Sequence, residues 1–207
     1  KVEFECEFLG SVNTLINPSK LKNLVFENPI QKNAGFDVYE SPIKDHNYLI
    51  TVDVARGLGN DYSAFIVFDI TNFPYKAVAK YRNNEIKPML FPSIIADIGK
   101  AYNKAFILCE VNDIGDQVAS ILNYDLEYDN LLMCSQRGRA GQVVGAGFSG
   151  KRSQLGVRTT QAVKKLGCSN LKTLLEDDKI LIIDYDIISE LTTFSQKHNS
   201  FEAEEGC

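Results

Sequence analysis

The order of hydrophobic patterns along the chain is the feature that most restricts its fold. Residues 48–54, 63–70 and 75–81 are apolar segments that are rich in β-branched residues or alternate in polarity, which predicts three strands in an antiparallel meander. Residues 91–103 then carry apolar side chains at helical spacing, and residues 105–110 form a short apolar run typical of a buried parallel strand. Meander strands followed by strand–helix units predict an α/β fold with a mixed sheet flanked by helices.

Shorter elements are expected in the rest of the chain. In order, they are a helix at 113–123, a strand at 131–134, a glycine-rich hairpin or loop at 138–150, helices at 155–166 and 169–177, a strand at 179–183 and a helix from 186 to 194. Alternating short strands and helices of this kind continue the α/β pattern.

The first 46 residues differ from the rest because Asn, Pro and Gly break their apolar segments into short pieces. We interpret residues 1–46 as a lead-in or linker that packs on the core, with a strand near residues 2–8. Residues 47–207 then form the main domain. The chain begins at Lys1 rather than Met and stops shortly after an acidic segment, so we expect it to be a fragment of a longer protein.

Composition excludes several classes of protein. Hydrophobic residues make up 44% of the 207 residues, which is ordinary for a globular domain with a sizeable core. The five cysteines are scattered and form no CxxC pair, so neither a zinc site nor a disulfide framework is indicated. There is no signal peptide, and no apolar run approaches the roughly 18 residues of a membrane span. A cytosolic domain with reduced thiols is the resulting expectation.

Two acidic residues stand out because they lie in or at the end of apolar strands. Asp53 is flanked by Val52 and Val54, and Glu110 closes the apolar run 105–110. A carboxylate in such a place needs compensation of its charge, and a divalent cation such as Mg²⁺ supplies it. Ligands of α/β sheets gather beyond the carboxyl ends of the strands, so these two acids are expected to converge. The alternative is that each forms an ion pair with Lys or Arg.

Two further residues lie close to Asp53 in the sequence and have open alternatives. Asp61 is either an outer metal ligand or water-holding group, or a cap of the turn at residues 57–60. Arg56 either contacts a phosphate or forms a salt bridge with Asp61 or Asp113.

The net charge of −5 does not favour nucleic-acid binding, but the distribution of charge does. No Asp or Glu occurs between Asn130 and Leu175. The basic residues of this stretch are Arg137, Arg139, Lys151, Arg152, Arg158, Lys164, Lys165 and Lys172. One wholly basic segment in an acidic protein predicts a surface that faces a polyanion. The alternative is a solvated loop and helix whose charges are balanced by acidic neighbours in space.

Other chemistry is not indicated. The segment 145–151 has the glycine and lysine spacing of a P-loop, but Arg152 occupies the position of the Ser/Thr that binds Mg²⁺. His46 and His198 have no metal-ligand spacing, and there is no Gly-x-Ser-x-Gly nucleophile motif. We therefore expect neither nucleotide binding nor acyl transfer.

The segments around Asp53 and Glu110 resemble known catalytic motifs. Residues 51–57 (TVDVARG), followed by 61–64 (DYSA), resemble the first catalytic motif of phage terminase large subunits, and residues 109–115 (CEVNDIG) resemble the second. Residues 74–88 and 189–194 match as well. The resemblance covers nearly the whole chain and is closest to the C-terminal nuclease domain of T-even-type bacteriophages.

This resemblance implies an RNase H-like fold of the resolvase and integrase group, and two-metal hydrolysis of DNA by Mg²⁺, with Mn²⁺ able to substitute. It assigns the first catalytic acid to Asp53 and the second to Glu110. Asp61, eight positions after Asp53, is a further candidate catalytic residue because of its position rather than the resemblance. Family members carry a third acid just after an acidic segment that ends in glycine. The sequence reaches this point at Gly206, so the third metal ligand is expected beyond Cys207.

The resemblance also implies partners. Its substrate would be concatemeric double-stranded viral DNA, cut with little sequence specificity during genome packaging in the cytoplasm of the infected bacterium. An ATPase domain upstream in the same polypeptide, the portal and procapsid, and the small terminase subunit would be its protein partners, without a membrane. The expected DNA contacts are Arg56, Arg137, Arg139, Lys151, Arg152, Arg158, Lys164 and Lys165. The rival hypothesis is a non-catalytic module that grips DNA or docks on the portal.

Overall fold

The computed structural model describes residues 14–135, 141–146, 153–197 and 200–202 of the chain. The first half contains α1 (Pro18–Lys22), β1 (Gln31–Asn33), β2 (Phe36–Val38), β3 (Tyr48–Asp53), β4 (Ser63–Asp69), β5 (Tyr75–Asn83) and α2 (Phe91–Ala101). The second half contains β6 (Phe106–Cys109), α3 (Gly115–Ser120), a π-helical turn (Ile121–Asp125), β7 (Leu132–Ser135), β8 (Val143–Ala146), β9 (Ser153–Leu155), α4 (Gln161–Glu176), β10 (Ile180–Leu181), α5 (Tyr185–Thr193), β11 (Ser195–Lys197) and β12 (Ser200–Glu202). The strand expected near residues 2–8 lies outside the described residues.

The main sheet has the mixed strand directions that the sequence predicts. Its strands lie in the order β1-β2-β5-β4-β3-β6, and β10 pairs with β5 off this path. The meander β3–β4–β5 is antiparallel, whereas β6 is parallel to β3 and β10 is parallel to β5. The strands expected at 48–54, 63–70, 75–81 and 105–110 are therefore confirmed.

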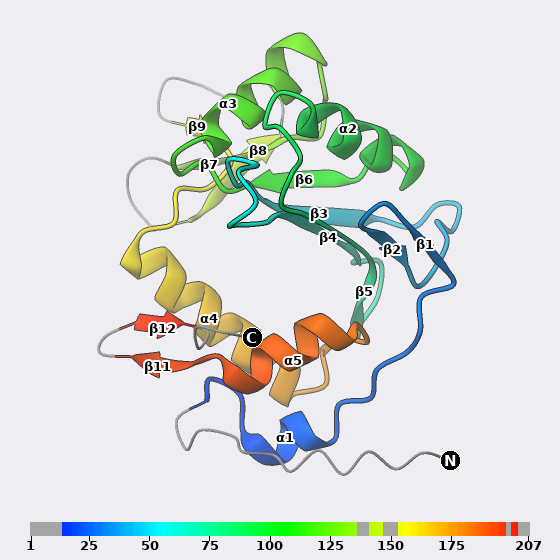
Figure 1. The fold of residues 1–207 in the computed structure, drawn as a ribbon, viewed down its shortest axis with the longest axis vertical. Coiled ribbons are helices and arrows are strands. Elements are labelled where there is room, and N and C mark those ends of the chain that lie inside the picture. The colour runs from blue at the N-terminus through cyan, green and yellow to red at the C-terminus, as the bar shows by residue number, and fades with distance from the viewer. Residues whose placement is uncertain (1–13, 136–140, 147–152, 198–199, 203–207) are drawn as a thin grey trace.

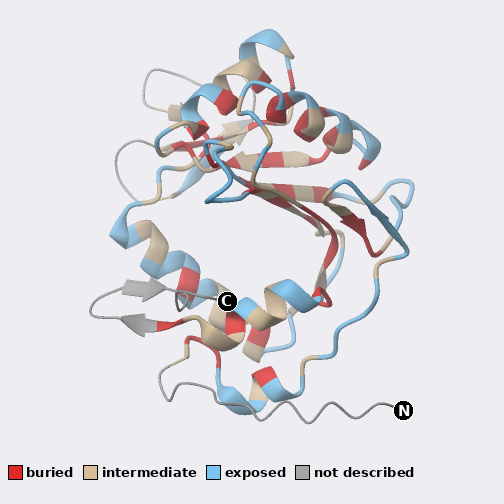
Figure 2. Cartoon of the chain, in the orientation of Figure 1, coloured by how far each residue is buried: buried red, intermediate tan, exposed pale blue. Residues whose placement is uncertain are grey.

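The two faces of the main sheet have different coverings. Figure 1 shows α2 and α3 on one side of the sheet, and α4 and α5 on the other. The side covered by α2 and α3 holds the larger core. Ile50 and Phe65 of the sheet and Ile95 of α2 are fully buried there or nearly so. Their alternation with half-buried neighbours along β3 and β4 gives the sheet one closed face and one partly open face (Figure 2).

A second, smaller core lies under α4 and α5. Leu15, Ile16 and Leu21 from the start of the chain pack there with Leu175 and Leu191. Burial of an aliphatic side chain contributes about 1.5–3 kcal/mol, so this cluster ties the early residues to the two late helices. Residues 31–38 also supply strands to the main sheet, through β1 and β2.

A buried group of charges connects the two parts of the molecule. The Lys80 ammonium on β5 lies 2.6 Å from Asp184 and 2.6 Å from Asp186, at the start of α5. Asp37 on β2 lies 3.9 Å from the same ammonium, and the Tyr39 hydroxyl donates to Asp184 at 2.6 Å. This group holds the start of α5 against the open face of the sheet.

The structure differs from the sequence prediction between residues 153 and 177. The prediction of two helices, at 155–166 and 169–177, is wrong. One continuous helix, α4, covers Gln161–Glu176, and Ser153–Leu155 form the strand β9 instead. Thr160 caps this helix by accepting a bond from the Val163 amide at 3.3 Å. Gly167 continues the helix, since a single glycine costs only about 1 kcal/mol there.

The helix expected at 113–123 is shorter than predicted. α3 covers only Gly115–Ser120, and a π-helical turn at Ile121–Asp125 completes it. The strand expected at 131–134 is confirmed as β7, but it belongs to a separate sheet with the order β8-β7-β9. An isolated bridge between Ile107 and Leu131 joins this small sheet to β6.

Candidate metal centre

Asp53 and Glu110 lie side by side at the carboxyl ends of two parallel strands. The register pairs Val52 of β3 with Cys109 of β6, and the Glu110 amide donates to the Val52 carbonyl at 2.9 Å. Because Val52 and Cys109 point into the larger core, the acids that follow them point to the open face. A cleft of about 300 Å³ there is lined by both acids and by Thr159. The convergence that the sequence predicts is therefore present.

The two carboxyl groups perturb each other. The pKa of Asp53 is raised to about 6 by partial desolvation and by the negative charge of Glu110, with a hydrogen bond between the two groups acting in the same direction. Within the described residues, neither acid has a Lys or Arg ion-pair partner. The alternative that each acid forms an ion pair with Lys or Arg is therefore not found among the described residues. An uncompensated pair of carboxylates is a suitable ligand set for a divalent cation.

Backbone packing fixes the position of Glu110. The Asn112 amide donates to the Glu110 carboxylate at 3.1 Å and to the Thr159 carbonyl at 3.0 Å. A Cβ atom on Gly115 would lie 2.0 Å from the Glu110 carbonyl oxygen, so this position accepts only glycine. A Cβ atom on Gly156 would lie 2.2 Å from the carbonyl oxygen of Cys109, and its φ is +71°. The acid is therefore held by close contacts on both sides.

The loop after Asp53 is anchored by a buried hydroxyl. Ser63, which is fully buried, accepts a hydrogen bond from the Ala55 amide at 3.0 Å and donates to the Ala55 carbonyl at 3.2 Å. This contact fixes the chain two residues after Asp53. Neither Ser63 nor Asn112 is evident as a site residue from the sequence, because both act through contacts that only the strand pairing creates.

Asp61 lies in the same region as the acid pair. A cleft of about 440 Å³ is lined by Asp53, Asp61 and Asp113, among others, and the charge of Asp61 contributes to the raised pKa of Asp53. The turn at 57–60 is held instead by Asn84, whose amide donates to the Gly59 carbonyl at 2.9 Å. Within the described residues, no three His, Cys, Asp or Glu side chains converge as a metal-binding group, so Asp61 does not complete a three-residue site.

Arg56 forms one of the two salt bridges that the sequence leaves open. Its Nε and Nη2 atoms donate to the two carboxylate oxygens of Asp113 at 2.9 and 2.8 Å. Both side chains are exposed, so the pair contributes at most about 1 kcal/mol and leaves the guanidinium accessible at the cleft.

Only part of the predicted basic surface lies in the described residues. Arg158 is exposed and stands between Val157 and Thr159, which line the cleft with Glu110. Lys165 is exposed on α4 and Lys164 is half-buried. The other predicted contacts, Arg137, Arg139, Lys151 and Arg152, lie outside the described residues.

The structure also places Lys172 and His46. Lys172 donates to the Leu15 carbonyl and to Glu176, both at 2.8 Å, so it ties the early residues to α4. His46 lies 2.6 Å from Asp69, whereas His198 is outside the described residues. No helix among the described residues is both long and apolar enough to cross a bilayer.

A mixed sheet with helices on both sides, and with an uncompensated acid pair at the ends of adjacent parallel strands, is the arrangement of the RNase H-like class of domains. Residues 50–207 match the family described as the terminase RNaseH-like domain. The match covers more than half of the chain, and the chain belongs to this family.

Solved structures agree with this assignment at the level of the fold. The large terminase nuclease of thermophilic phage G20c with bound cobalt has a TM-score of 0.69 and 20% identity, over 95% of this chain and 91% of that chain. The same nuclease with bound magnesium has a TM-score of 0.69 and 21% identity over the same shares. The large terminase nuclease domain of Thermus phage P74-26 has a TM-score of 0.62 and 22% identity, over 88% and 78%.

Two of the expectations from the motifs are confirmed. The RNase H-like fold and the nuclease domain of a phage large terminase are both supported by the family and by the structural neighbours. The narrower assignment to T-even-type phages stays a prediction, since these neighbours come from thermophilic phages.

Proposed function

We propose that Asp53 and Glu110 bind divalent cations with which this domain cuts the phosphodiester backbone of double-stranded viral DNA. The observation that carries the proposal is the acid pair itself: two carboxyl groups in contact, without a basic partner among the described residues. The G20c nuclease structures with magnesium, cobalt and zinc support the use of divalent metal in this fold. Mg²⁺ is the expected ion and Mn²⁺ the expected substitute.

The proposed chemistry is two-metal hydrolysis. Two cations would activate the attacking water and neutralise charge on the leaving oxygen. Asp53 would bind both cations, and its contact with Glu110 and its place in the lining of the cleft that contains Asp61 support this role. Glu110 would bind one cation, and the Asn112 amide would keep its carboxylate oriented. Asp61 would hold a water molecule or act as an outer ligand.

The DNA would lie along the open face of the sheet. Arg158 lies between two residues that line the cleft, and α4 carries Lys164 and Lys165 beyond it. Together with Arg56 and with the basic residues at 137, 139, 151 and 152, these side chains would contact phosphates, which gives binding with little sequence specificity. The proposed partners are the upstream ATPase domain, the small terminase subunit and the portal with its procapsid, in the cytoplasm of the infected bacterium.

Nicking of supercoiled plasmid in Mg²⁺ or Mn²⁺ tests the assignment, with a parent protein that extends past Cys207 and so includes the position expected for the third metal ligand. We expect the parent protein to cut, and Asp53→Asn and Glu110→Gln to lose cutting while keeping DNA affinity. Asp97→Asn is the matched control, because Asp97 is exposed on α2, on the other side of the sheet. If both site variants cut as well as the parent, these acids are not the metal ligands. If the parent binds DNA but does not cut it, the domain is a DNA-gripping module instead.

A further inference from the structure

Arg82 lies in the same row of the sheet as the acid pair. The register pairs Arg82 of β5 with Ala64 of β4, and Ala64 with Asp53 of β3, and Glu110 follows on the next strand. Residues opposite each other in paired strands point to the same face, so Arg82 projects to the open face with the two acids. Two strand spacings separate its Cα atom from that of Asp53 by roughly 10 Å. The side chain between them is only a methyl group.

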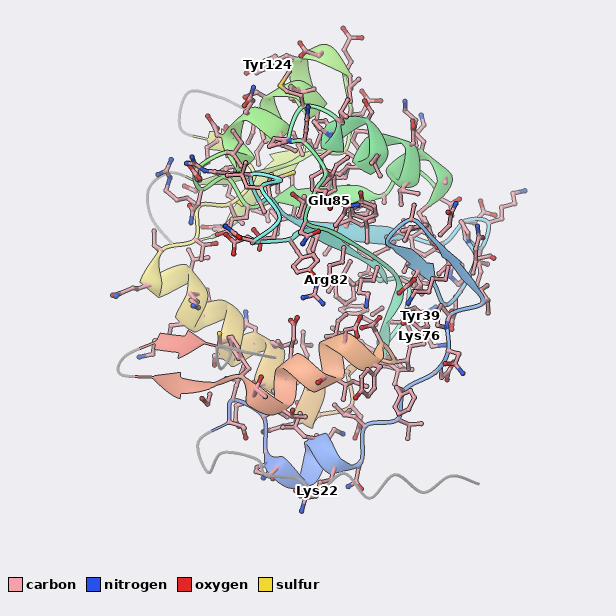
Figure 3. The ribbon with its side chains drawn as sticks, viewed as in Figure 1. Lys22, Tyr39, Lys76, Arg82, Glu85 and Tyr124 are labelled. Atoms are coloured by element: carbon pink, nitrogen blue, oxygen red, sulfur yellow. The ribbon has the colours of Figure 1, made fainter. Side chains whose placement is uncertain are left out.

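The guanidinium of Arg82 is held loosely, on an aromatic ring. It lies 3.9 Å from the centre of the Tyr62 ring, and its contact with Glu190 of α5 is 3.6 Å long. Figure 3 shows Arg82 projecting from β5 toward α5. Tyr62 itself is partly exposed and lines the cleft that contains Asp53 and Asp61.

Two neighbouring cations differ from Arg82 in their partners. Arg56 donates from Nε and Nη2 to both carboxylate oxygens of Asp113 in short contacts, and Lys80 is buried between Asp184 and Asp186. The side chain of Arg82 is 36% exposed and, among the residues that the structure describes, has one long ion-pair contact. Stacking on Tyr62 leaves the N–H groups at the rim of the guanidinium free to bind an anion in the plane of the group.

We propose that Arg82, supported by the ring of Tyr62, binds a backbone phosphate of the DNA next to the scissile bond, and that Glu190 of α5 occupies this guanidinium when no DNA is bound. The inference rests on the proposed nuclease function. A guanidinium can donate two parallel hydrogen bonds to two oxygens of one phosphate. The small side chain of Ala64, between Arg82 and Asp53, leaves room for that phosphate to approach. In this arrangement successive phosphates of one strand would follow the row from Arg82 toward Asp53, and the acid pair would receive the neighbouring phosphate.

The role of Glu190 follows from charge. A phosphate that binds Arg82 must displace the Glu190 carboxylate, so removal of this carboxylate should favour DNA. The gain is small, because a half-exposed ion pair contributes at most about 1 kcal/mol, which corresponds to no more than about fivefold in affinity. Loss of the Arg82 phosphate contact should cost about tenfold or more.

The test measures the affinity of the purified protein for a short labelled DNA duplex, with Ca²⁺ in place of Mg²⁺, over a series of salt concentrations. We expect Arg82→Gln to weaken binding about tenfold or more and to make the salt dependence shallower by about one unit. Glu190→Gln should strengthen binding by up to about fivefold. In the double variant the Glu190→Gln gain should vanish, because the cation that it released is absent.

The control is Lys179→Gln, which removes a cation near the opposite end of β5, where the Tyr75 amide donates to the Lys179 carbonyl. We expect it to leave affinity and salt dependence unchanged. If Arg82→Gln matches the parent in both, or if Glu190→Gln still strengthens binding without Arg82, the inference is wrong. If the parent cuts plasmid and Asp53→Asn does not, the proposed function stands even where the inference about Arg82 fails. A parent that neither binds nor cuts DNA would overturn the proposed function instead.

Discussion

Gly156 shows how tightly the backbone around the acid pair is packed. Its φ of +71° suits glycine, and a Cβ atom would lie 2.2 Å from the Cys109 carbonyl oxygen and 2.8 Å from Val111. We expect Gly156→Ala to lower the free energy of unfolding by about 1–3 kcal/mol and to reduce DNA cutting, because the strand end that carries Glu110 must move. Urea unfolding and plasmid nicking measure the two effects.

Gly167 is the matched control for this substitution. It lies within α4, and a Cβ atom there would meet nothing within 4 Å. Gly167→Ala should therefore raise the free energy of unfolding by about 0.5–1 kcal/mol. A loss of stability at this position, or none at Gly156, would contradict the packing described here.

The repulsion between Asp53 and Glu110 predicts a trade-off between stability and metal binding. In EDTA, Asp53→Asn should raise the free energy of unfolding by up to about 1 kcal/mol, because it removes a like-charge pair on adjacent strands. Mg²⁺ should raise the Tm of the parent through preferential binding to the folded state, but not that of the variant. Differential scanning fluorimetry with and without Mg²⁺ measures both. An equal Mg²⁺ response in the two proteins would place the cation elsewhere.

The sequence reveals the acid pair but not the residues that support it. Asp53 and Glu110 are conspicuous because a carboxylate within an apolar strand is unusual in any fold. Arg82 and Asn112 lie within segments that match the family, but their own pattern gives them no role, and their places become visible only when the strand register is known. Long-range pairing decides which side chains meet, and a single sequence does not encode it locally.

At the level of elements, α5 depends on charges at its first turn. Asp184 caps the helix by accepting from the Ile187 amide at 2.8 Å, and it also contacts Lys80 and Tyr39. Burial alone would raise the pKa of Asp184, but these partners together hold it below its ordinary value. Burial would lower the pKa of Lys80, but the bonds with Asp184 and Asp186 raise it.

These pKa shifts predict how stability depends on pH. The depressed pKa of Asp184 contributes stability above the ordinary value of 3.8, which is lost as the pH falls through the folded-state pKa. The raised pKa of Lys80 contributes below 10.5 and is lost as the pH rises through its folded-state value. We expect the free energy of unfolding to be constant between these two pH limits and to fall in acid. Asp184→Asn should make this fall in acid shallower.

At neutral pH, Asp184→Asn should lower the free energy of unfolding by about 2–3 kcal/mol. A fully broken buried ion pair costs about 3–5 kcal/mol, but Asp186 remains beside Lys80. Asp177→Asn is the control, because its ion pair with Lys179 is exposed and contributes at most about 1 kcal/mol. Urea titrations at several pH values measure both. Identical pH profiles for Asp184→Asn and the parent would contradict the role given to this cluster.

The elements that the sequence predicts well are those with uniform patterns. β3, β4, β5 and β6 have apolar runs of the right length, and α2 has helical spacing with a proline in its first turn. The segment 153–177 misleads because Leu155 fits the helical spacing of the residues after it, although it pairs with β7 as a strand. Tertiary pairing outweighs local pattern in such short segments.

At the scale of the whole molecule, the two cores are expected to unfold together. β10, which follows α4, is hydrogen-bonded to β5 of the main sheet, and the buried Lys80 joins the same strand to α5. The smaller core therefore cannot open without breaking contacts of the main sheet.

Ile16 tests this coupling, because it is fully buried in the smaller core and belongs to no strand of the main sheet. Ile16→Ala should lower the free energy of unfolding by about 2–5 kcal/mol, whereas Val25→Ala, at a 72% exposed position, should change it by no more than about 0.5 kcal/mol. Hydrogen exchange should become faster in α4 and α5 and equally in the slowest amides of β3–β5, because one global opening exposes both cores. Faster exchange confined to α4 and α5 would mean that the smaller core unfolds alone, and that the Lys80 cluster does not couple it to the sheet that carries the acid pair.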